Sequence, residues 1–223
     1  MDKAFWIERW EQAQIGFHLP AVHPLLARHW TALGVGPGSR VFVPLCGKSV
    51  DLVYLLQQGM SVTGIELSPL AIRQFLAEQS LVAEPADAGG LPLFEVSGLR
   101  LFQGDFFQLD AAVLGPVDAV YDRAALIALP PDLQTRYAAR LQALAQPAAP
   151  ILLITFDYDP ADMSGPPFAT PAEQVRRLFG DRYVIEVLEQ VDALAAGDFD
   201  GGNLVFVDHI GNAAQLGRRG LAT

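Results

Sequence analysis

The sequence predicts an α/β protein built on a doubly wound sheet that is mostly parallel and carries one antiparallel edge strand. Three features of the 223-residue chain lead to this prediction. Short apolar runs alternate with segments of helical length, which is typical of parallel sheets whose crossover helices cover both faces. The stretch 41–66 reads as a strand, a glycine turn, a helix and a second strand. The last expected strands, 183–191 and 204–207, have no long helix between them, which favours antiparallel pairing.

The stretch 41–66 also contains the predicted ligand site. A strand over 41–43 leads into a turn at Gly47, a helix follows over 49–58, and a second strand over 62–65 ends at Glu66. In doubly wound sheets, ligands bind at the carboxyl ends of the strands, and an acid about 20 residues after the glycine turn binds a ribose. The position of Glu66 predicts that its carboxylate accepts hydrogen bonds from vicinal ribose hydroxyls. The alternative is an exposed acid at a strand end.

The glycine turn argues against a ligand bound through its phosphates. A P-loop needs a glycine where Phe42 stands, and the dinucleotide fingerprint needs further glycines where Leu45 and Cys46 stand. Without a P-loop, Lys48 is interpreted as a solvated side chain near the turn. One glycine suffices for a ligand with one ribose and no phosphate, and S-adenosylmethionine is such a ligand. A nucleotide-dependent oxidoreductase is disfavoured by the missing glycines but stays an open alternative.

The remaining elements are expected around this core. An amphipathic helix with Trp6 and Trp10 opens the chain, and the Ser-Pro pair at 68–69 marks another helix start. Residues 84–91 read as a surface excursion, and residues 170–173 read as a capping box. The other expected elements are a helix from His23 to Leu33, a hairpin over 94–102, a strand over 117–122, a helix from Pro131 and a strand over 151–154.

Three candidate site residues have a structural reading beside a functional one. Trp10 shares a helix face with Trp6, so periodicity favours packing on the core over a place in a ligand pocket. Asp105, after Gly104 at the end of the third parallel strand, is either a turn residue or a contact of an adenine edge. Arg123, just past a strand, is either a salt-bridged surface residue or a planar fork that binds an anion.

Composition narrows the function classes further. At 51% hydrophobic and 18% charged, the chain fits one globular domain over 1–223, with an N-terminal helical segment over about 1–36 covering the active site and a frayed tail over about 211–223. Its net charge of −10 argues against nucleic acid as a partner. No membrane-helix window, secretory signal or metal-ligand spacing is visible in the sequence. The expectation is a cytoplasmic monomer without a metal site.

Six motifs carry a family resemblance. They are Trp6-Ile7-Glu8-Arg9-Trp10, Gly16-Phe17-His18, Val43-Pro44-Leu45-Cys46-Gly47-Lys48-Ser49, Gly64-Ile65-Glu66-Leu67-Ser68, Tyr121-Asp122-Arg123-Ala124-Ala125-Leu126 and Gly165-Pro166-Pro167-Phe168. Together they resemble the thiopurine S-methyltransferase family, in the same order and over nearly the whole chain. The resemblance implies the Rossmann-like class I methyltransferase fold, S-adenosylmethionine as donor, and small aromatic or heterocyclic thiols such as thiopurines as acceptors. It is greatest for bacterial members, which are linked with tellurite or selenium resistance.

The resemblance also implies roles for residues of this chain. Its donor-binding positions correspond to Trp10, Leu45, Gly47, Glu66, Gly104, Asp105 and Arg123. Its acceptor pocket corresponds to Phe17, His18, Pro167 and Phe168. Arg123 is expected to be catalytic as well, because a nearby positive charge favours an anionic acceptor. Mammalian members carry a second pocket arginine where residues 193–202 of this chain have no basic residue. The alternative function is a sensor that binds S-adenosylmethionine without transferring its methyl group.

Overall fold

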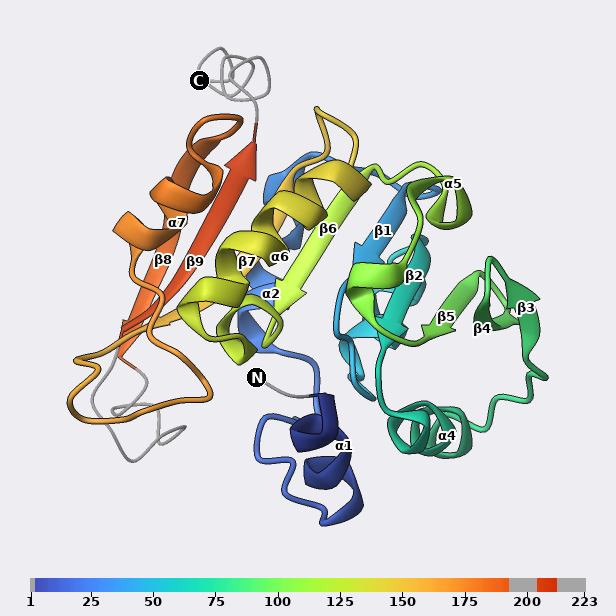
Figure 1. Cartoon of the computed structure of the whole chain (residues 1–223). Helices are drawn as coiled ribbons and strands as arrows, with labels where there is room; N and C mark the ends of the chain where they lie inside the picture. The colour runs from blue at the N-terminus through green and yellow to red at the C-terminus, as the bar shows by residue number, and fades with distance from the viewer. Residues whose placement is uncertain (1–2, 193–203, 212–223) are drawn as a thin grey trace.

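A computed structural model of the chain describes residues 3–192 and 204–211. Within these residues one nine-stranded sheet crosses the molecule in the order β3-β4-β5-β2-β1-β6-β7-β9-β8 (Figure 1). The strands, in this order, are Ala86–Ala88, Leu91–Val96, Leu99–Gln103, Ser61–Glu66, Arg40–Val43, Ala119–Arg123, Ile151–Asp157, Leu204–Gly211 and Val184–Asp192.

The five central strands confirm the predicted parallel sheet. β5, β2, β1, β6 and β7 pair parallel with their neighbours. β9 pairs antiparallel with both β7 and β8, which confirms the antiparallel pairing expected for the last two strands. The surface excursion expected over 84–91 is a correction, since β3 lies within it and pairs antiparallel with β4. β3 has only three residues and none is buried, so no apolar run marked it.

Helices cover both faces of the sheet, as a doubly wound fold requires. One apolar core forms beneath α5, α6 and α7, and a second beneath α2, η1, α3 and α4. β1 serves both, since Phe42 packs in the first core while Val41 and Val43 pack in the second. The helices are α2 (Pro24–His29), η1 (Trp30–Leu33), α3 (Asp51–Gln57), α4 (Pro69–Glu78), η2 (Phe106–Gln108), α5 (Ala111–Leu114), η3 (Leu126–Ala128), α6 (Pro131–Leu144) and α7 (Ala172–Phe179).

Two expected helix starts have different outcomes. Ser68 caps α4 by accepting a hydrogen bond from the Ala71 amide at 3.3 Å, which confirms the first. The capping box over 170–173 is wrong, because the Thr170 hydroxyl donates to the Phe168 carbonyl and accepts from the Gln134 side chain at 2.9 Å. α7 therefore begins without a side-chain cap. The local sequence predicted the position of α7 correctly, but the Thr170 hydroxyl is bonded to the distant Gln134 side chain instead of capping the helix.

The N-terminal segment passes the carboxyl end of the sheet. α1 (Lys3–Glu11) lies beyond the ends toward which the β1, β2 and β6 arrows point (Figure 1). Farther along, the His23 amide donates to Asp51 Oδ1 at 2.8 Å, and the Tyr121 hydroxyl donates to Asp51 Oδ2 at 2.8 Å. Asp51 is buried at the start of α3. This carboxylate therefore joins the N-terminal segment to the sheet beneath the predicted site.

The structure also bears on membrane-spanning helices and on the C-terminal tail. Among the described helices, none combines the length and apolarity that crossing a membrane requires. Gly211, the first residue of the expected frayed tail, is the last residue of β9, and the rest of that tail lies outside the described residues.

Candidate active site

The turn between β1 and α3 is folded back onto the end of β2. The Glu66 carboxylate accepts hydrogen bonds from the Gly47 amide at 2.9 Å and from the Ser68 amide at 2.6 Å. The Cys46 amide donates to the Ile65 carbonyl at 3.0 Å. These bonds join the turn, the strand end and the start of α4 into one unit. Sequence order alone could not establish that the acid contacts the glycine turn.

Two residues of this turn have left-handed backbones. Gly47 has a φ of +55°, and Leu45 has a φ of +46° although it carries a side chain. A non-glycine residue in this region costs roughly 1–3 kcal/mol, and such strain gathers at functional sites. Ala124, directly after Arg123, has a φ of +60°. The left-handed positions thus mark the carboxyl ends of both β1 and β6, where ligands are expected.

Trp10 lies directly against the glycine turn. A Cβ atom placed on Gly47 would be 3.1 Å from a ring carbon of Trp10, whose side chain is buried. The ring of Phe17 packs edge-on against Trp10, with centroids 5.6 Å apart, and against Trp6 at 5.8 Å. The packing reading of Trp10 is therefore confirmed, and the packing partner is the predicted donor loop. Its contact with a bound donor stays a prediction.

Replacing Gly47 by alanine is expected to disturb both the turn and Trp10. The left-handed φ disfavours a side chain by about 1–2 kcal/mol, and the new methyl group would press on the Trp10 ring. We expect a loss of about that size in unfolding free energy and about tenfold weaker binding of S-adenosylhomocysteine. Urea denaturation and calorimetry measure the two effects. Gly36→Ala is the matched control, since nothing lies within 4 Å of its added Cβ; equal losses in both variants would contradict the proposed contact.

Glu66 is suited to bind hydroxyl groups. Its side chain is buried, and burial raises its pKa to about 6, although the amides of Ser68, Gly47 and Leu67 act in the opposite direction. Each carboxylate oxygen accepts one backbone hydrogen bond and retains acceptor capacity for a further donor. A ribose diol therefore fits the chemistry of this position. The reading of Glu66 as an exposed acid is wrong.

Gly104 and Asp105 belong to the neighbouring strand end. The Gly104 amide donates to the Glu66 carbonyl at 2.8 Å. Asp105 Oδ1 accepts from the Phe107 amide at 3.0 Å, and Asp105 Oδ2 lies 2.7 Å from Lys3 Nζ at the start of α1. The turn reading of Asp105 is confirmed, while an adenine contact stays a prediction. The ion pair with Lys3 was not expected, and it brings α1 to this side of the site.

Arg123 ends β6 on the other side of the glycine turn. Its side chain is half-buried, and within the described residues its guanidinium makes no hydrogen bond or ion pair. The interpretation of Arg123 as a surface residue held in a salt bridge therefore finds no support within the described residues. The preceding residue, Asp122, is fully buried and accepts from the Tyr137 hydroxyl at 2.7 Å and from the Leu126 amide at 3.1 Å. Asp122 thus fixes the backbone from which Arg123 projects.

Asp122 gives the fold a specific pH dependence. Burial raises its pKa to about 6, against hydrogen bonds from Tyr137, Leu126 and Ala125 that lower it. A raised carboxyl pKa means that the folded state binds the proton more tightly than the unfolded state does. This contribution to stability is therefore fully present below about pH 4 and is lost as pH rises through 6. Urea denaturation at pH 5 and pH 7.5 measures it. We expect Asp122→Asn to reduce the pH 5 advantage by about 1–2 kcal/mol, and an unchanged pH dependence would contradict this assignment.

The acceptor-pocket candidates lie on two separate segments. His18 follows Phe17, and burial lowers its pKa, as do the nearby charges of Lys48 and Arg123, while Glu78 raises it. His18 is therefore within electrostatic reach of Arg123. The interpretation of Lys48 as solvated is wrong, because its side chain is 11% exposed and its Nζ lies 2.6 Å from Glu78 Oε1.

Pro167 and Phe168 lie in a loop beside the segment that follows Arg123. The Phe168 amide donates to the Ile127 carbonyl at 2.7 Å, and the Tyr158 hydroxyl donates to the Pro167 carbonyl. Within the described residues, no ring contact or hydrogen bond joins this loop to Phe17 or His18. The structure thus brings the loop to the β6 end of the site, and a shared acceptor pocket stays a prediction.

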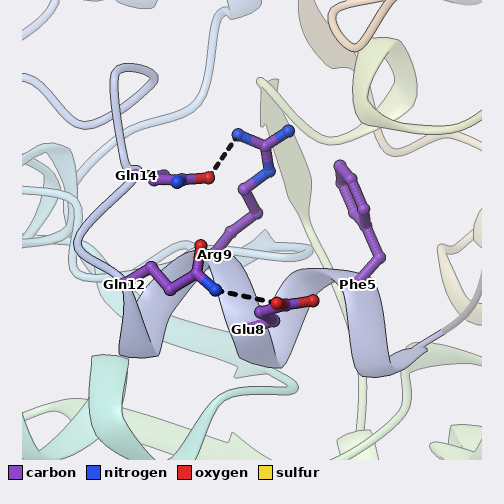
Figure 2. A pocket seen from close by; sticks show the side chains of 5 residues that line it. All are labelled: Phe5, Glu8, Arg9, Gln12 and Gln14. Atoms are coloured by element: carbon purple, nitrogen blue, oxygen red, sulfur yellow. Dashed lines mark hydrogen bonds between the residues drawn. The ribbon is translucent and has the colours of Figure 1, made fainter.

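The outer face of α1 carries a separate hollow of about 190 Å³. Figure 2 shows the side chains that line it, which are Phe5, Glu8, Arg9, Gln12 and Gln14. Gln12 donates to Glu8 and Arg9 donates to Gln14, both at 2.7 Å, so these groups satisfy one another. None of them is a predicted site residue. In the part of the chain that the structure covers, no three His, Cys, Asp or Glu side chains gather as a metal site would require.

Solved structures show similarity at the level of the fold. A 1,6-didemethyltoxoflavin-N1-methyltransferase from Burkholderia thailandensis, solved with S-adenosylhomocysteine, aligns with a TM-score of 0.62 at 18% identity and covers 94% of this chain and 87% of that one. Magnesium protoporphyrin IX methyltransferase from Synechocystis, also solved with S-adenosylhomocysteine, aligns with a TM-score of 0.65 at 14% identity, covering 95% and 100%. Both support the class I methyltransferase fold.

Sequence relatives are much more similar. Thiopurine S-methyltransferase of Methylococcus capsulatus is 50% identical over 196 residues, and that of Nitrosospira multiformis is 47% identical over 194 residues. Each alignment covers 87% of this chain and 88% of the relative. The family model for thiopurine S-methyltransferase matches residues 1–207. The chain therefore belongs to the thiopurine S-methyltransferase family, whose members are S-adenosylmethionine-dependent methyltransferases.

Proposed function

We propose that this methyltransferase acts on the sulfur of small aromatic or heterocyclic thiols, including thiopurines, and on ionisable selenium or tellurium species of similar size. The observation that supports the proposal most is that two groups of different chemistry lie at the carboxyl ends of neighbouring parts of the sheet. Glu66 offers a buried carboxylate at the end of β2, and Arg123 offers a guanidinium without a described partner at the end of β6. The first suits a neutral diol, and the second suits an anion.

The donor side of the site is assigned to the turn and its neighbours. Glu66 holds the ribose hydroxyls, and Trp10 covers the turn and excludes water from it. Asp105, at the next strand end, is assigned to the adenine, and its Oδ1 atom is held by the Phe107 amide. When bound, S-adenosylmethionine supplies a methyl group that its sulfonium has already activated. The remaining task of the protein is to orient an acceptor behind that group.

The acceptor side is assigned to Arg123 and the Phe17 segment. The positive charge of Arg123 lowers the pKa of a nearby thiol and so increases the fraction of the nucleophilic anion. Aromatic thiols, thiones and hydrogen selenide ionise near neutral pH, so the site needs no dedicated base for them. Phe17 packs against Trp10 and helps to close the site. A dry site favours the reaction, because charge on the nucleophile is neutralised as the new bond forms.

The direct test is product formation. The protein is incubated with S-adenosylmethionine and a panel containing 6-mercaptopurine, thiophenol, hydrogen selenide and matched alcohols, and S-adenosylhomocysteine and methylated products are measured. We expect product with the thiols and the selenide and none with the alcohols. Binding of the donor without turnover on any acceptor would favour the sensor instead. Greater thermal stabilisation by NAD than by S-adenosylmethionine would favour the oxidoreductase.

A further inference from the structure

Two buried polar side chains are bonded to the loop that carries Phe168. Gln134 on α6 and Thr170 are both fully buried, and the Gln134 amide group donates to the Thr170 hydroxyl at 2.9 Å. Replacing two hydrogen-bonded partners by apolar groups of the same shape can leave stability nearly unchanged. Folding stability alone therefore does not require a polar pair at this place in the core.

The Thr170 hydroxyl serves the loop instead of the helix that follows it. A threonine at a helix start ordinarily bonds one of the first free amides and so stabilises the helix. α7 begins without a side-chain cap, while the Thr170 hydroxyl donates to the Phe168 carbonyl at 3.1 Å. The chain thus forgoes a helix cap, and the Phe168 carbonyl gains a fixed donor.

Phe168 is held on both sides of its side chain. Its amide donates to the Ile127 carbonyl at 2.7 Å, and its carbonyl accepts from Thr170. A Cβ atom placed on Gly165 would lie 2.6 Å from the Phe168 ring, so the ring rests directly on the Gly165 backbone. The orientation of this ring therefore depends on a small number of contacts, and the Thr170 hydroxyl makes one of them.

The other anchor of the loop lies next to the segment that carries Arg123. Ile127 belongs to η3, and the Leu126 amide in the same turn donates to the Asp122 carboxylate at 3.1 Å. Asp122 directly precedes Arg123 in the chain. Hydrogen bonds thus lead from Asp122 through η3 to Phe168, and they hold its ring near the strand end from which Arg123 projects.

We propose that Gln134 and Thr170 are positioning residues for the acceptor, which hold the Phe168 ring as a fixed wall that selects planar rings. The inference rests on the proposed function and names the property of the acceptor that is selected. A fixed aromatic ring favours a second aromatic ring through stacked or edge-on contact, and a puckered saturated ring of equal size gains less. Phe168 is half-buried, so the rest of the chain covers only part of its surface.

The binding of two unreactive ring carboxylates tests this selectivity. Benzoate and cyclohexanecarboxylate carry the same charge and a six-carbon ring, but only the ring of benzoate is planar. Calorimetry measures both on the complex with S-adenosylhomocysteine. We expect the wild type to prefer benzoate, and Gln134→Met combined with Thr170→Val to lower this preference about threefold to tenfold. Thr170→Ser keeps the hydroxyl and should retain the preference.

A control variant separates positioning from general loosening of α6. Gln142 also lies on α6, and its side chain donates at 3.1 Å to the carbonyl of Leu178 on α7. Gln142→Met should therefore keep the preference for benzoate. If Gln134 and Thr170 only fasten α6 to the chain before α7, the double variant will lose stability in urea and still prefer benzoate as the wild type does. That result overturns the proposal, as does a wild type that binds both carboxylates equally.

Donor binding and turnover distinguish this inference from the proposed function. The double variant should bind S-adenosylhomocysteine as the wild type does, because Gln134 and Thr170 are bonded to the loop at the β6 end of the site. Its KM for thiophenol should rise severalfold with a nearly unchanged kcat. If the wild type prefers benzoate but methylates no thiol, the proposed function fails and the positioning role stands. If thiophenol is methylated and the double variant leaves its KM and the benzoate preference unchanged, only the positioning role fails.

Discussion

Replacing Arg123 by alanine is expected to lower kcat/KM for 6-mercaptopurine or thiophenol by roughly 100-fold while the protein stays folded. Within the described residues, no side chain is bonded to the Arg123 guanidinium. The truncation therefore leaves no buried group without its hydrogen-bond partner. The loss arises because a nearby cation favours the anionic form of the acceptor. Without it, the bound thiol ionises at higher pH. The deficit should therefore shrink as the assay pH rises above the pKa of the thiol.

Steady-state kinetics over a pH series measure this effect, and circular dichroism checks the fold. Arg177→Ala is the matched control, because Arg177 is an exposed arginine on α7 whose partner is Glu173. It should retain wild-type kinetics. Arg123→Lys should recover part of the activity, since it keeps the charge but loses the planar fork. Wild-type turnover in Arg123→Ala would remove Arg123 from the mechanism. A deficit that does not depend on pH would contradict its role in favouring the anionic acceptor.

Local signals in the sequence were sufficient for the framework of the fold. The Ser-Pro pair at 68–69 caps and opens α4, because both preferences act within one helical turn. The hairpin of β4 and β5 forms around the tight turn at Ser97 and Gly98 for the same reason. Apolar runs buried on both faces identified the parallel strands. These features depend on neighbours along the chain, so one sequence contains the necessary information.

Contacts between distant segments could not be predicted in this way. Trp10 is the clearest case, since helical periodicity predicted that it packs but could not name Gly47 as its partner. Lys48 was interpreted as solvated because its partner Glu78 lies on α4, 30 residues farther along the chain. Side-chain pairs of this kind depend on how the elements are placed in space. The candidate site residues were therefore predictable as types at strand ends, while their hydrogen bonds and charges required the structure.

Replacing Glu66 by alanine is expected to weaken binding of S-adenosylhomocysteine by roughly 10- to 100-fold, the range for hydrogen bonds to a charged group. The carboxylate that would hold the ribose also holds the Gly47 and Ser68 amides, so a structural effect must be separated from a direct one. Calorimetry with S-adenosylhomocysteine and its 2′,3′-dideoxy analogue does this. A direct contact makes the variant insensitive to the missing hydroxyls, whereas a purely structural role weakens both ligands equally.

The pH dependence of donor binding provides a second measure of the same contact. The Glu66 pKa is about 6, and the ionised carboxylate is the better acceptor for hydroxyl groups. Affinity for S-adenosylhomocysteine should therefore rise as pH increases from 5 to 7, and Glu66→Ala should abolish this rise. Glu173→Ala, a change at an exposed glutamate of α7, should keep it. A rise that persists in Glu66→Ala would show that a group other than Glu66 causes it and would contradict this assignment.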